Sequence, residues 1–472
     1  VMDFDDTLVN LYDLNSATPL YVDNDLIVIS SSTFDGGTQN FHVYTFKPAS
    51  SNPNAGKKII DVFSMIPYIS YAESEAIIKF NQTNSEYFAT LRFADYGYYG
   101  DPLENNKAVA QASDQLIIDI MAGDGPDILL NGFDFSEFNN PDYFIDLNTL
   151  IAEDKAFDKS KYFDNIIEAS QNYDGALYQI PASFTIDCIA AKVSDVGEGH
   201  IGFTYDDYDR FLDEACNGVS PIKGTRTEYL DLCITAGYFD YLKDGKVDFN
   251  NEGFKQACDF ATSHFAEDAP FDDHMMYIST GVGCLTEPTR TDFFDPDVLM
   301  WQFGGTPETV GFYGFPSSLE HGPTAYISSS AAISAEADDK TKDACWNLIK
   351  IMLDDEVQTN LKSSFPMNKA ALSNMLVTMA DEADSHYNTY INMGYSEAEI
   401  AMFNEHQVNR SIVDSFYEAI TNVTDVARSD SSLEIIIAEE LPAYFAGQKD
   451  IDSVIGIIND RAQTIYDERS SK

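Results

Sequence analysis

The sequence has little positive charge, little cysteine and almost no tryptophan. Among 472 residues, 28 are Lys or Arg and 78 are Asp or Glu, which gives a formal net charge of −50. Such a charge repels phosphate backbones and anionic membrane surfaces, so we expect no nucleic-acid partner. The acidic residues are scattered along the chain and form no block, which is typical of an evenly solvated surface.

Metal and cofactor motifs are also missing. The six cysteines lie between Cys188 and Cys345, with no C-x-x-C pair and no Cys/His cluster at zinc spacing, and the seven histidines are scattered singly. We therefore expect no metal and no other cofactor, and buried free thiols are favoured over disulfides, which stay possible. No stretch approaches the ~20 uncharged apolar residues that a membrane-spanning helix needs. The sequence opens in the polar VMDFDDTLVN, which is not a signal peptide.

The first part of the chain has the pattern of a small β-rich unit. Two runs favourable to strands, Leu26–Ser30 and Phe41–Phe46, flank a pair of glycines. The stretch ASSNPNAGKK follows and is rich in Ser, Asn, Pro and Gly, which is typical of a linker. We predict a β-rich appendage with its linker over residues 1–56.

From residue 57 the pattern changes to alternating strands and helices. The run KKIIDVFSM is typical of a strand, a helical pattern places Ala76, Ile77 and Phe80 on one face, and YFATLRF alternates like another strand. This order predicts a β-α-β unit. The next helix is expected to end at Gly123, a residue that readily adopts the left-handed conformation of a helix end. Its predicted buried residues are Leu116, Ile117, Ile120 and Met121.

The segment after that helix contains our first candidate for a ligand site. Residues 128–130 form an apolar run with no polar alternation, as expected of a parallel strand covered on both faces. Ligands of open α/β sheets bind beyond the carboxyl ends of the strands, where Asn131, Phe133 and Asp134 follow. An amide and a carboxylate hydrogen-bond hydroxyl groups, and an aromatic ring packs against C–H surface. The alternative for Phe133 is that its ring fills the core beneath the loop.

The segment IMAGDGPDIL resembles the extracellular solute-binding proteins of ABC importers, in the sugar-binding, maltose-binding-protein-like branch. The likeness covers about residues 57 to 472 and leaves out the β-rich appendage. It continues through FIDLNTLI, DGALYQIPASF, GFTYDDYDRFL, GFPSSLEHGPTAYISSSAAIS, KDACWNLIKIMLDDEVQ, FPMNKAAL and the terminal YFAGQKDIDSVIGIINDRAQTIYDE.

The resemblance implies an α/β, two-lobed periplasmic-binding-protein type II fold with a hinge, joined to the small N-terminal β appendage. The chain would cross between the lobes three times, near Ser183, near residues 325–330 and near residues 365–366. Hinge closure would trap a ligand between the lobes. The expected division is lobe 1 at 57–183, lobe 2 at 184–326, a return segment of lobe 1 at 327–365, and C-terminal helices of lobe 2 at 366–472.

The expected ligand-binding residues lie in strand-end loops of the first lobe, at the first crossover, and in the second lobe with the returning hinge. They are Tyr68, Tyr98, Tyr99, Asn131, Phe133, Asp134, Ser183, Phe184, Glu287, Trp301, Ser329 and Ser330. Surface turns explain the tyrosines of DYGYYG nearly as well. Trp301 is one of two tryptophans and lies in a stretch with no clear helical face, which favours a ring that stacks on a sugar.

The resemblance further implies a monomeric receptor that delivers a small molecule, a carbohydrate, to ABC transporter permease subunits. It implies an extracellular, membrane-anchored lipoprotein whose signal segment lies outside this sequence. A peptide or cationic solute, bound by carboxylates such as Asp134 and Glu287, stays open as an alternative ligand.

The other alternative is a glycoside hydrolase with paired carboxylates. A suitable pair carries little weight, because 78 acidic residues would supply one in any fold. The sequence also has no H-E-x-x-H, no G-x-S-x-G and no Walker motif. We therefore expect a binding protein and no enzyme.

Overall fold

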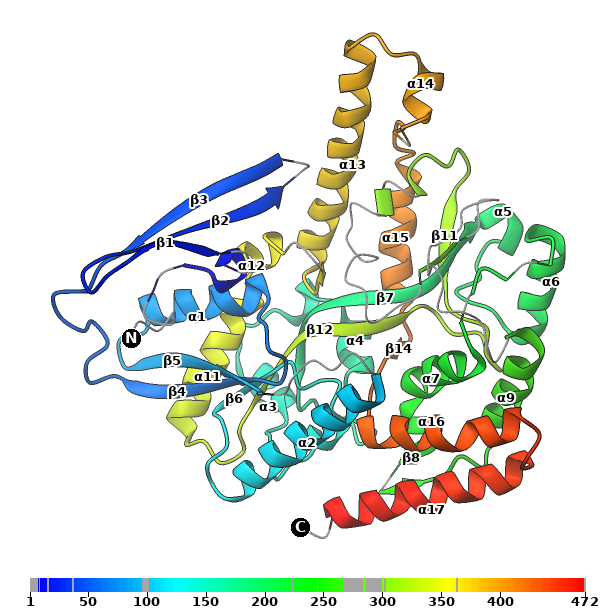
Figure 1. Ribbon diagram of the computed structural model, residues 1–472, viewed down its shortest axis with the longest axis horizontal. Helices are drawn as coiled ribbons and strands as arrows, with labels where there is room; N and C mark the ends of the chain where they lie inside the picture. The colour runs from blue at the N-terminus through cyan, green and yellow to red at the C-terminus, as the bar shows by residue number, and fades with distance from the viewer. Residues whose placement is uncertain are drawn as a thin grey trace.

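The computed structural model describes residues 7, 9–14, 17–35, 38–95, 102–218, 220–222, 224–243, 245–265, 283–285, 299–300, 303–361, 364–403 and 405–470. These residues form a three-stranded sheet near the N-terminus, a nine-stranded sheet through the middle of the molecule, and a two-stranded sheet (Figure 1). Within the described part of the chain, no helix is long and apolar enough to cross a membrane.

The three-stranded sheet is antiparallel and projects to one side of the molecule (Figure 1). Its strands are β1 (Thr18–Val22), β2 (Ile27–Asp35) and β3 (Thr38–Phe46). Strands β2 and β3 contain the two predicted runs except Leu26, which directly precedes β2. Strand β1 is not predicted, because TPLYV is short and contains a proline.

A short helical turn, η2 (Leu11–Leu14), joins this region to α1 (Tyr71–Thr83). The Asn10 Nδ2 donates a hydrogen bond to the carbonyl oxygen of Tyr71 over 3.2 Å, and the Leu11 N–H donates to the Ser74 Oγ over 2.8 Å. The N-terminal segment is therefore fastened to the helix that follows the first strand of the large sheet.

The large sheet has the order β10-β7-β12-β6-β4-β5, with β11 and β13 paired to β7 and β14 paired to β12. Its strands are β4 (Lys58–Ser64), β5 (Tyr87–Phe93), β6 (Ile128–Leu130), β7 (Ile180–Lys192), β10 (Gly283–Leu285), β11 (Val310–Tyr313), β12 (Thr324–Ile333), β13 (Phe365–Pro366) and β14 (Asp425–Val426). A separate hairpin is made of β8 (Leu242–Lys243) and β9 (Lys246–Val247).

Two long antiparallel strands, β7 and β12, run through both halves of the molecule (Figure 1). At one end, residues 331–333 of β12 pair with β6, which is parallel to β4. At the other end, residues 188–192 of β7 pair with β10 and β11. We call the part around β4, β5 and β6 the first lobe, and the part around α6, α7 and α9 the second lobe.

Helices surround both lobes. They are α2 (Pro102–Met121), α3 (Leu147–Glu153), α4 (Asp164–Ala169), α5 (Val193–Val196), α6 (Tyr205–Ala215), α7 (Arg226–Ala236), α8 (Tyr238–Tyr241), α9 (Glu252–His264), α11 (Asp339–Met352), α12 (Asp355–Thr359), α13 (Lys369–Asn392), α14 (Glu397–Ala401), α15 (Ser411–Thr421), α16 (Ser431–Phe445) and α17 (Ile451–Ser470). Short 3-10 turns are η3 (Ser136–Phe138) and η4 (Lys159–Lys161).

Local sequence patterns explain several of these elements. The predicted face of α1 is buried, and a capping box formed by Ser70 and Glu73 begins the helix. Gly123 has a positive φ of 82° just after α2, as predicted for a helix end. Met121 is the exception, because it is 47% exposed. Met121 is the last residue of α2, so no further turn of the helix covers its side chain.

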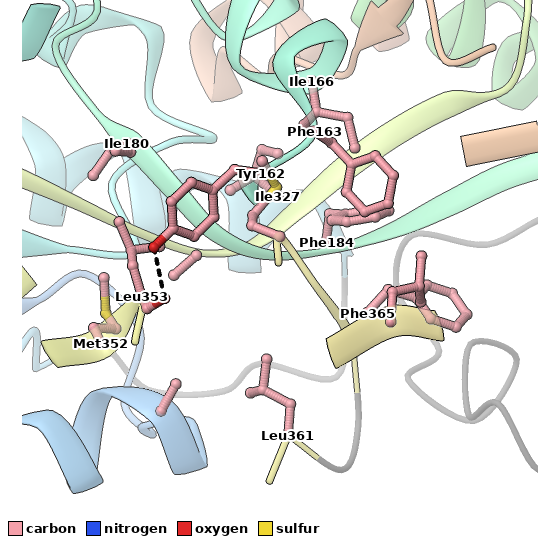
Figure 2. Packing of buried hydrophobic residues seen from close by; sticks show 14 of the residues in the cluster. Tyr162, Phe163, Ile166, Ile180, Phe184, Ile327, Met352, Leu353, Leu361 and Phe365 are labelled. Atoms are coloured by element: carbon pink, nitrogen blue, oxygen red, sulfur yellow. Dashed lines mark hydrogen bonds between the residues drawn. The ribbon is translucent and has the colours of Figure 1, made fainter. Parts of the chain in front are cut away.

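The core around the two long strands is apolar and rich in aromatic rings (Figure 2). Phe184 of β7 lies edge-on to Phe163 and packs against Phe365 of β13, with centroid distances of 6.1 and 6.0 Å. The Tyr162 hydroxyl donates a hydrogen bond to the Leu353 carbonyl oxygen over 2.9 Å. This packing fixes the segment in which β7, β12 and β13 meet.

Candidate functional site

The end of β6 is held by hydrogen bonds to two neighbouring strands. Asn131 adopts a positive φ of 54°, a conformation that asparagine tolerates better than most residues. Its N–H donates to the Ser330 carbonyl oxygen over 3.0 Å, and its Nδ2 donates to the Ser64 Oγ over 3.1 Å. The loop that carries Phe133 and Asp134 is thereby directed away from the sheet at a fixed point.

Next to Asn131 lies a buried carboxylate, Glu73 of α1, which is 1% exposed. The Ser329 Oγ donates to its Oε1 over 3.0 Å, and the Ser70 N–H donates to its Oε2 over 2.6 Å. Burial raises the pKa of Glu73, while hydrogen bonds from Ser70, Ser329 and Asn131 lower it. The residue thus joins α1 to the strands that run between the lobes.

Tyr68 and Asp134 reach the surface beside this network. Tyr68 follows β4 and is 59% exposed, and Asp134 is exposed as well. Surrounding protein nevertheless raises the pKa of Asp134 to about 6. The pKa of the Tyr68 hydroxyl is raised by burial and then by the negative charges of Asp134 and Glu73. Asp134 has no ion pair with a described residue, so its carboxylate is available to a ligand.

Carboxylates of the second lobe approach Asp134. Glu434 lies in the first turn of α16, and its pKa is raised to about 8, first by burial and then by the charges of Asp231, Asp430 and Asp134, against the lowering effect of its hydrogen bond with Ser429. Burial also raises the pKa of Asp231 on α7 to about 6. We call Asp134, Asp231, Asp430 and Glu434 the acid cluster. Among the residues that the structure describes, no group of acidic, histidine or cysteine side chains is arranged to hold a metal ion.

A buried arginine links the lobes beneath this surface. The Arg428 Nη2 donates to the carbonyl oxygens of Ser170 and Gln171 over 2.7 and 2.8 Å. Its guanidinium lies 4.9 Å from the Phe133 ring centroid and 4.7 Å from that of Phe239. Burial lowers its pKa to about 10. Phe133 is only 2% exposed. Its ring therefore fills the core beneath the loop, which was the alternative to a ring that faces the ligand.

Other predicted site residues are buried as well. Phe184 belongs to the core in Figure 2, and Ser183 and Ser330 are fully buried. The Ser330 Oγ donates to the Gln179 Oε1 over 3.3 Å, whereas no described residue hydrogen-bonds the Ser183 Oγ. The predicted residues Tyr98, Tyr99, Glu287 and Trp301 lie outside the described residues.

The structure also contains a cavity of about 360 Å³ between the lobes, which sequence reasoning missed. The first lobe contributes Tyr143, Tyr173 and Tyr178 to its lining, together with Asn139, Asn140 and Asn172, and the second lobe contributes Tyr238, Phe239 and Tyr466. None of the predicted site residues that the structure describes lines this cavity. We call it the aromatic cavity.

The walls of the aromatic cavity are held together across the lobes. The Tyr238 hydroxyl donates to the Ser136 Oγ over 2.6 Å and lies 2.8 Å from the Tyr466 hydroxyl. The rings of Tyr173 and Phe239 meet edge-on at 6.0 Å. Aromatic faces beside amide groups suit a ligand that has both C–H surfaces and hydroxyl groups. The signal in the sequence is aromatic residues interspersed with Asn and Asp in segments without helical or strand periodicity, such as FNNPDYF and QNYDGALY.

No protein-family model and no curated protein matches this sequence. Solved structures do match its fold. The sugar-binding protein MalE from the phytopathogen Xanthomonas citri superposes with a TM-score of 0.54 at 14% identity, over 88% of this chain and 98% of that chain. A protein described as an oligosaccharide periplasmic-binding protein, from Synechococcus sp. MITs9220 and in complex with zinc, gives 0.52 at 12% identity, over 87% and 99%.

A de novo designed cysteine esterase also superposes, with a TM-score of 0.51 at 12% identity, over 88% of this chain and 99% of that chain. The chain therefore has the two-lobed periplasmic-binding-protein fold, as predicted. Because binding proteins and a designed esterase share this fold, the fold alone does not determine the function.

Proposed function

We propose that this chain is the substrate-binding receptor of an ABC transporter, which captures a mono- or oligosaccharide between its two lobes and delivers it to permease subunits. The observation that carries the proposal is the aromatic cavity, because both lobes contribute rings and amide groups to it. Sugars present C–H faces that pack on aromatic rings and hydroxyl groups that amides and carboxylates bind.

Hinge closure is the second part of the proposal. Since β7 and β12 belong to both lobes, a small bend in these strands would move one lobe against the other. A ligand that contacts Asp134 in the first lobe and Glu434 in the second would favour the closed form. We propose the lobe boundaries predicted above, a monomeric state, and an extracellular location with a lipid anchor as parts of the same account.

A cationic solute or a peptide is the second candidate ligand. The acid cluster favours it, because Asp134 faces solvent and forms no ion pair with a described residue. A positive ligand would restore the charged forms of groups whose pKa values burial has raised.

A thermal-shift screen across mono- and oligosaccharides, peptides and polyamines tests these ligand classes. A ligand at 100 times its dissociation constant stabilises the folded protein by about 2.7 kcal/mol, which a melting curve resolves. We expect carbohydrates to raise the melting temperature. The absence of a response to any carbohydrate would contradict the carbohydrate proposal, and a response to polyamines or peptides that Asp134→Ala abolishes would favour the second candidate.

A hydrolase is separated from a receptor by incubation with the stabilising oligosaccharide. We expect one equivalent to bind and no new reducing ends to appear. Release of many reducing ends per protein molecule would show turnover and overturn the receptor proposal.

A further inference from the structure

A second cavity, of about 380 Å³, lies inside the second lobe. It is bounded by α7, α9, the loop between β11 and β12, and the first residues of β12. None of the acid cluster lines it, and it shares no lining residue with the aromatic cavity. Leu232, Cys233 and Ala236 line it from α7. We call it the lobe-2 cavity.

Aromatic rings form much of its wall. Four tyrosines line it, namely Tyr205, Tyr229, Tyr241 and Tyr326. The Tyr205 ring stacks on Phe260 at 4.6 Å, and the Tyr241 ring stacks on Phe249 at 4.8 Å with an interplanar angle of 3°. The Tyr229 hydroxyl donates to the Pro316 carbonyl oxygen over 2.7 Å. These contacts hold the rings in place before any ligand arrives.

The charged groups of the wall are almost all negative. Asp187, Asp240 and Asp425 line the cavity, and none of the described residues that line it is a lysine or an arginine. Among these described residues only His321 can become a cation, and its Nδ1 already lies 2.8 Å from the Asp425 Oδ2. Asp187 of β7 is fully buried. Carboxylates in a low-dielectric wall create a negative potential in the cavity.

We propose that the lobe-2 cavity binds a small organic cation with an apolar body, such as a protonated primary amine that carries an aromatic group. The ammonium group would lie against the tyrosine faces, which attract cations, and near the carboxylates. The apolar body would pack against Leu232, Ala236 and Phe315, which also line the cavity. The volume lies in the range of small-molecule sites. This site is separate from the proposed solute site and does not depend on it.

Calorimetric titration of the full chain with phenethylamine tests the proposal, and 2-phenylethanol is the matched neutral probe of nearly the same size. We expect one equivalent of phenethylamine to bind at least about tenfold more tightly than the alcohol, because only the ammonium gains from the negative wall. Equal affinities, or no binding of the amine, would overturn the proposal.

Variants locate the binding. Ala236→Phe places a ring in the cavity and is expected to weaken phenethylamine binding by about tenfold or more, without change in solute binding between the lobes. Asp240→Asn removes one negative charge from an exposed lining residue and is expected to weaken the amine several-fold while the protein stays folded. Asp134→Asn, in the acid cluster, is the control and should leave amine affinity unchanged.

Melting curves accompany each titration. If Ala236→Phe does not fold, Asp240→Asn decides the question on its own. Amine affinity that is unchanged in Asp240→Asn and lost in Asp134→Asn would place the amine between the lobes and overturn the assignment to the lobe-2 cavity.

Discussion

The Ser329 Oγ donates a hydrogen bond to the Glu73 Oε1 over 3.0 Å, and this bond joins the shared strand β12 to the first turn of α1. Both residues are buried at 1% exposure. The loop before α1 carries Tyr68, which is one of two predicted residues that reach solvent among those described in the structure. The position of that loop is therefore tied to a strand that runs between the lobes.

Replacement of Ser329 tests this link. Ser329→Ala removes one donor from a buried carboxylate, so we expect the free energy of unfolding to fall by about 1 to 3 kcal/mol. Ser330→Ala is the matched control, because its hydroxyl donates to the neutral amide oxygen of Gln179 and should contribute less. Urea denaturation measures both. Equal losses of unfolding free energy in the two variants would show that the charge of Glu73 does not strengthen its hydrogen bond with Ser329.

Phe133 and Asp134 are adjacent but are expected to respond differently to truncation. Phe133→Ala removes a core ring that lies against Arg428, so we expect a loss of about 3 to 5 kcal/mol of stability. Asp134→Ala removes an exposed carboxylate that belongs to the acid cluster and does not line the aromatic cavity, so stability should change little, while affinity for a ligand that also reaches the acid cluster should fall by about 1 to 3 kcal/mol. Melting curves and titrations with a stabilising sugar measure the two effects. Unchanged affinity in Asp134→Ala would remove this residue from the ligand site.

Glu434 makes stability depend on pH. Its pKa is raised from the ordinary 4.5 to about 8 in the folded protein, chiefly by burial. Between these two pKa values the folded state holds a proton that the unfolded state releases. The stability that this proton contributes is therefore fully present below pH 4.5 and is lost as the pH rises through about 8. Glu434→Gln stays neutral, and its stability should gain on the wild type by up to about 1 kcal/mol per pH unit over this interval.

Glu440→Gln, in the same helix, is the control for this series. The Glu440 carboxylate accepts a hydrogen bond from Arg461 over 2.7 Å, and this contact is the main cause of its lowered pKa. Its removal should not reproduce the slope. Urea denaturation at several pH values gives the curves, and parallel curves for wild type and Glu434→Gln would contradict the assignment.

The N-terminal appendage is expected to be dispensable for folding. A chain that starts at Lys57 loses the hydrogen bonds from Asn10 and Leu11 to α1, each of which contributes about 1 kcal/mol. We expect this chain to fold with a slightly lower melting temperature and to bind the same sugar with the same affinity. Failure to fold would show that the β-rich segment is a structural part of the first lobe.

Elements set by neighbouring residues could be predicted from the sequence. The apolar face of α1, the glycine after α2 and the apolar run of β6 are local signals, and the structure has each of them. The pairing of β6 with β12 is antiparallel, although β6 is parallel to β4. Its partner lies far along the chain, so no local pattern reports it.

The candidate site was harder to predict for the same reason. Phe133 is a core residue whose ring lies against Arg428, and the two are brought together only by the fold. Glu434 lies in the apolar run SSLEIIIAEEL, where it resembles any exposed acid of a helix. The rings of the aromatic cavity come from segments of both lobes, and only the tertiary arrangement shows that they face one another.

Small-angle X-ray scattering of the monomer, with and without a saturating sugar chosen from the screen, tests the central claim most directly. Capture between hinged lobes predicts that the radius of gyration falls when the sugar binds, and that this fall requires a higher sugar concentration in Tyr173→Ala, which removes a ring that lines the aromatic cavity. An unchanged radius of gyration in the wild type, with calorimetry showing one equivalent of bound sugar, would contradict capture by hinge closure.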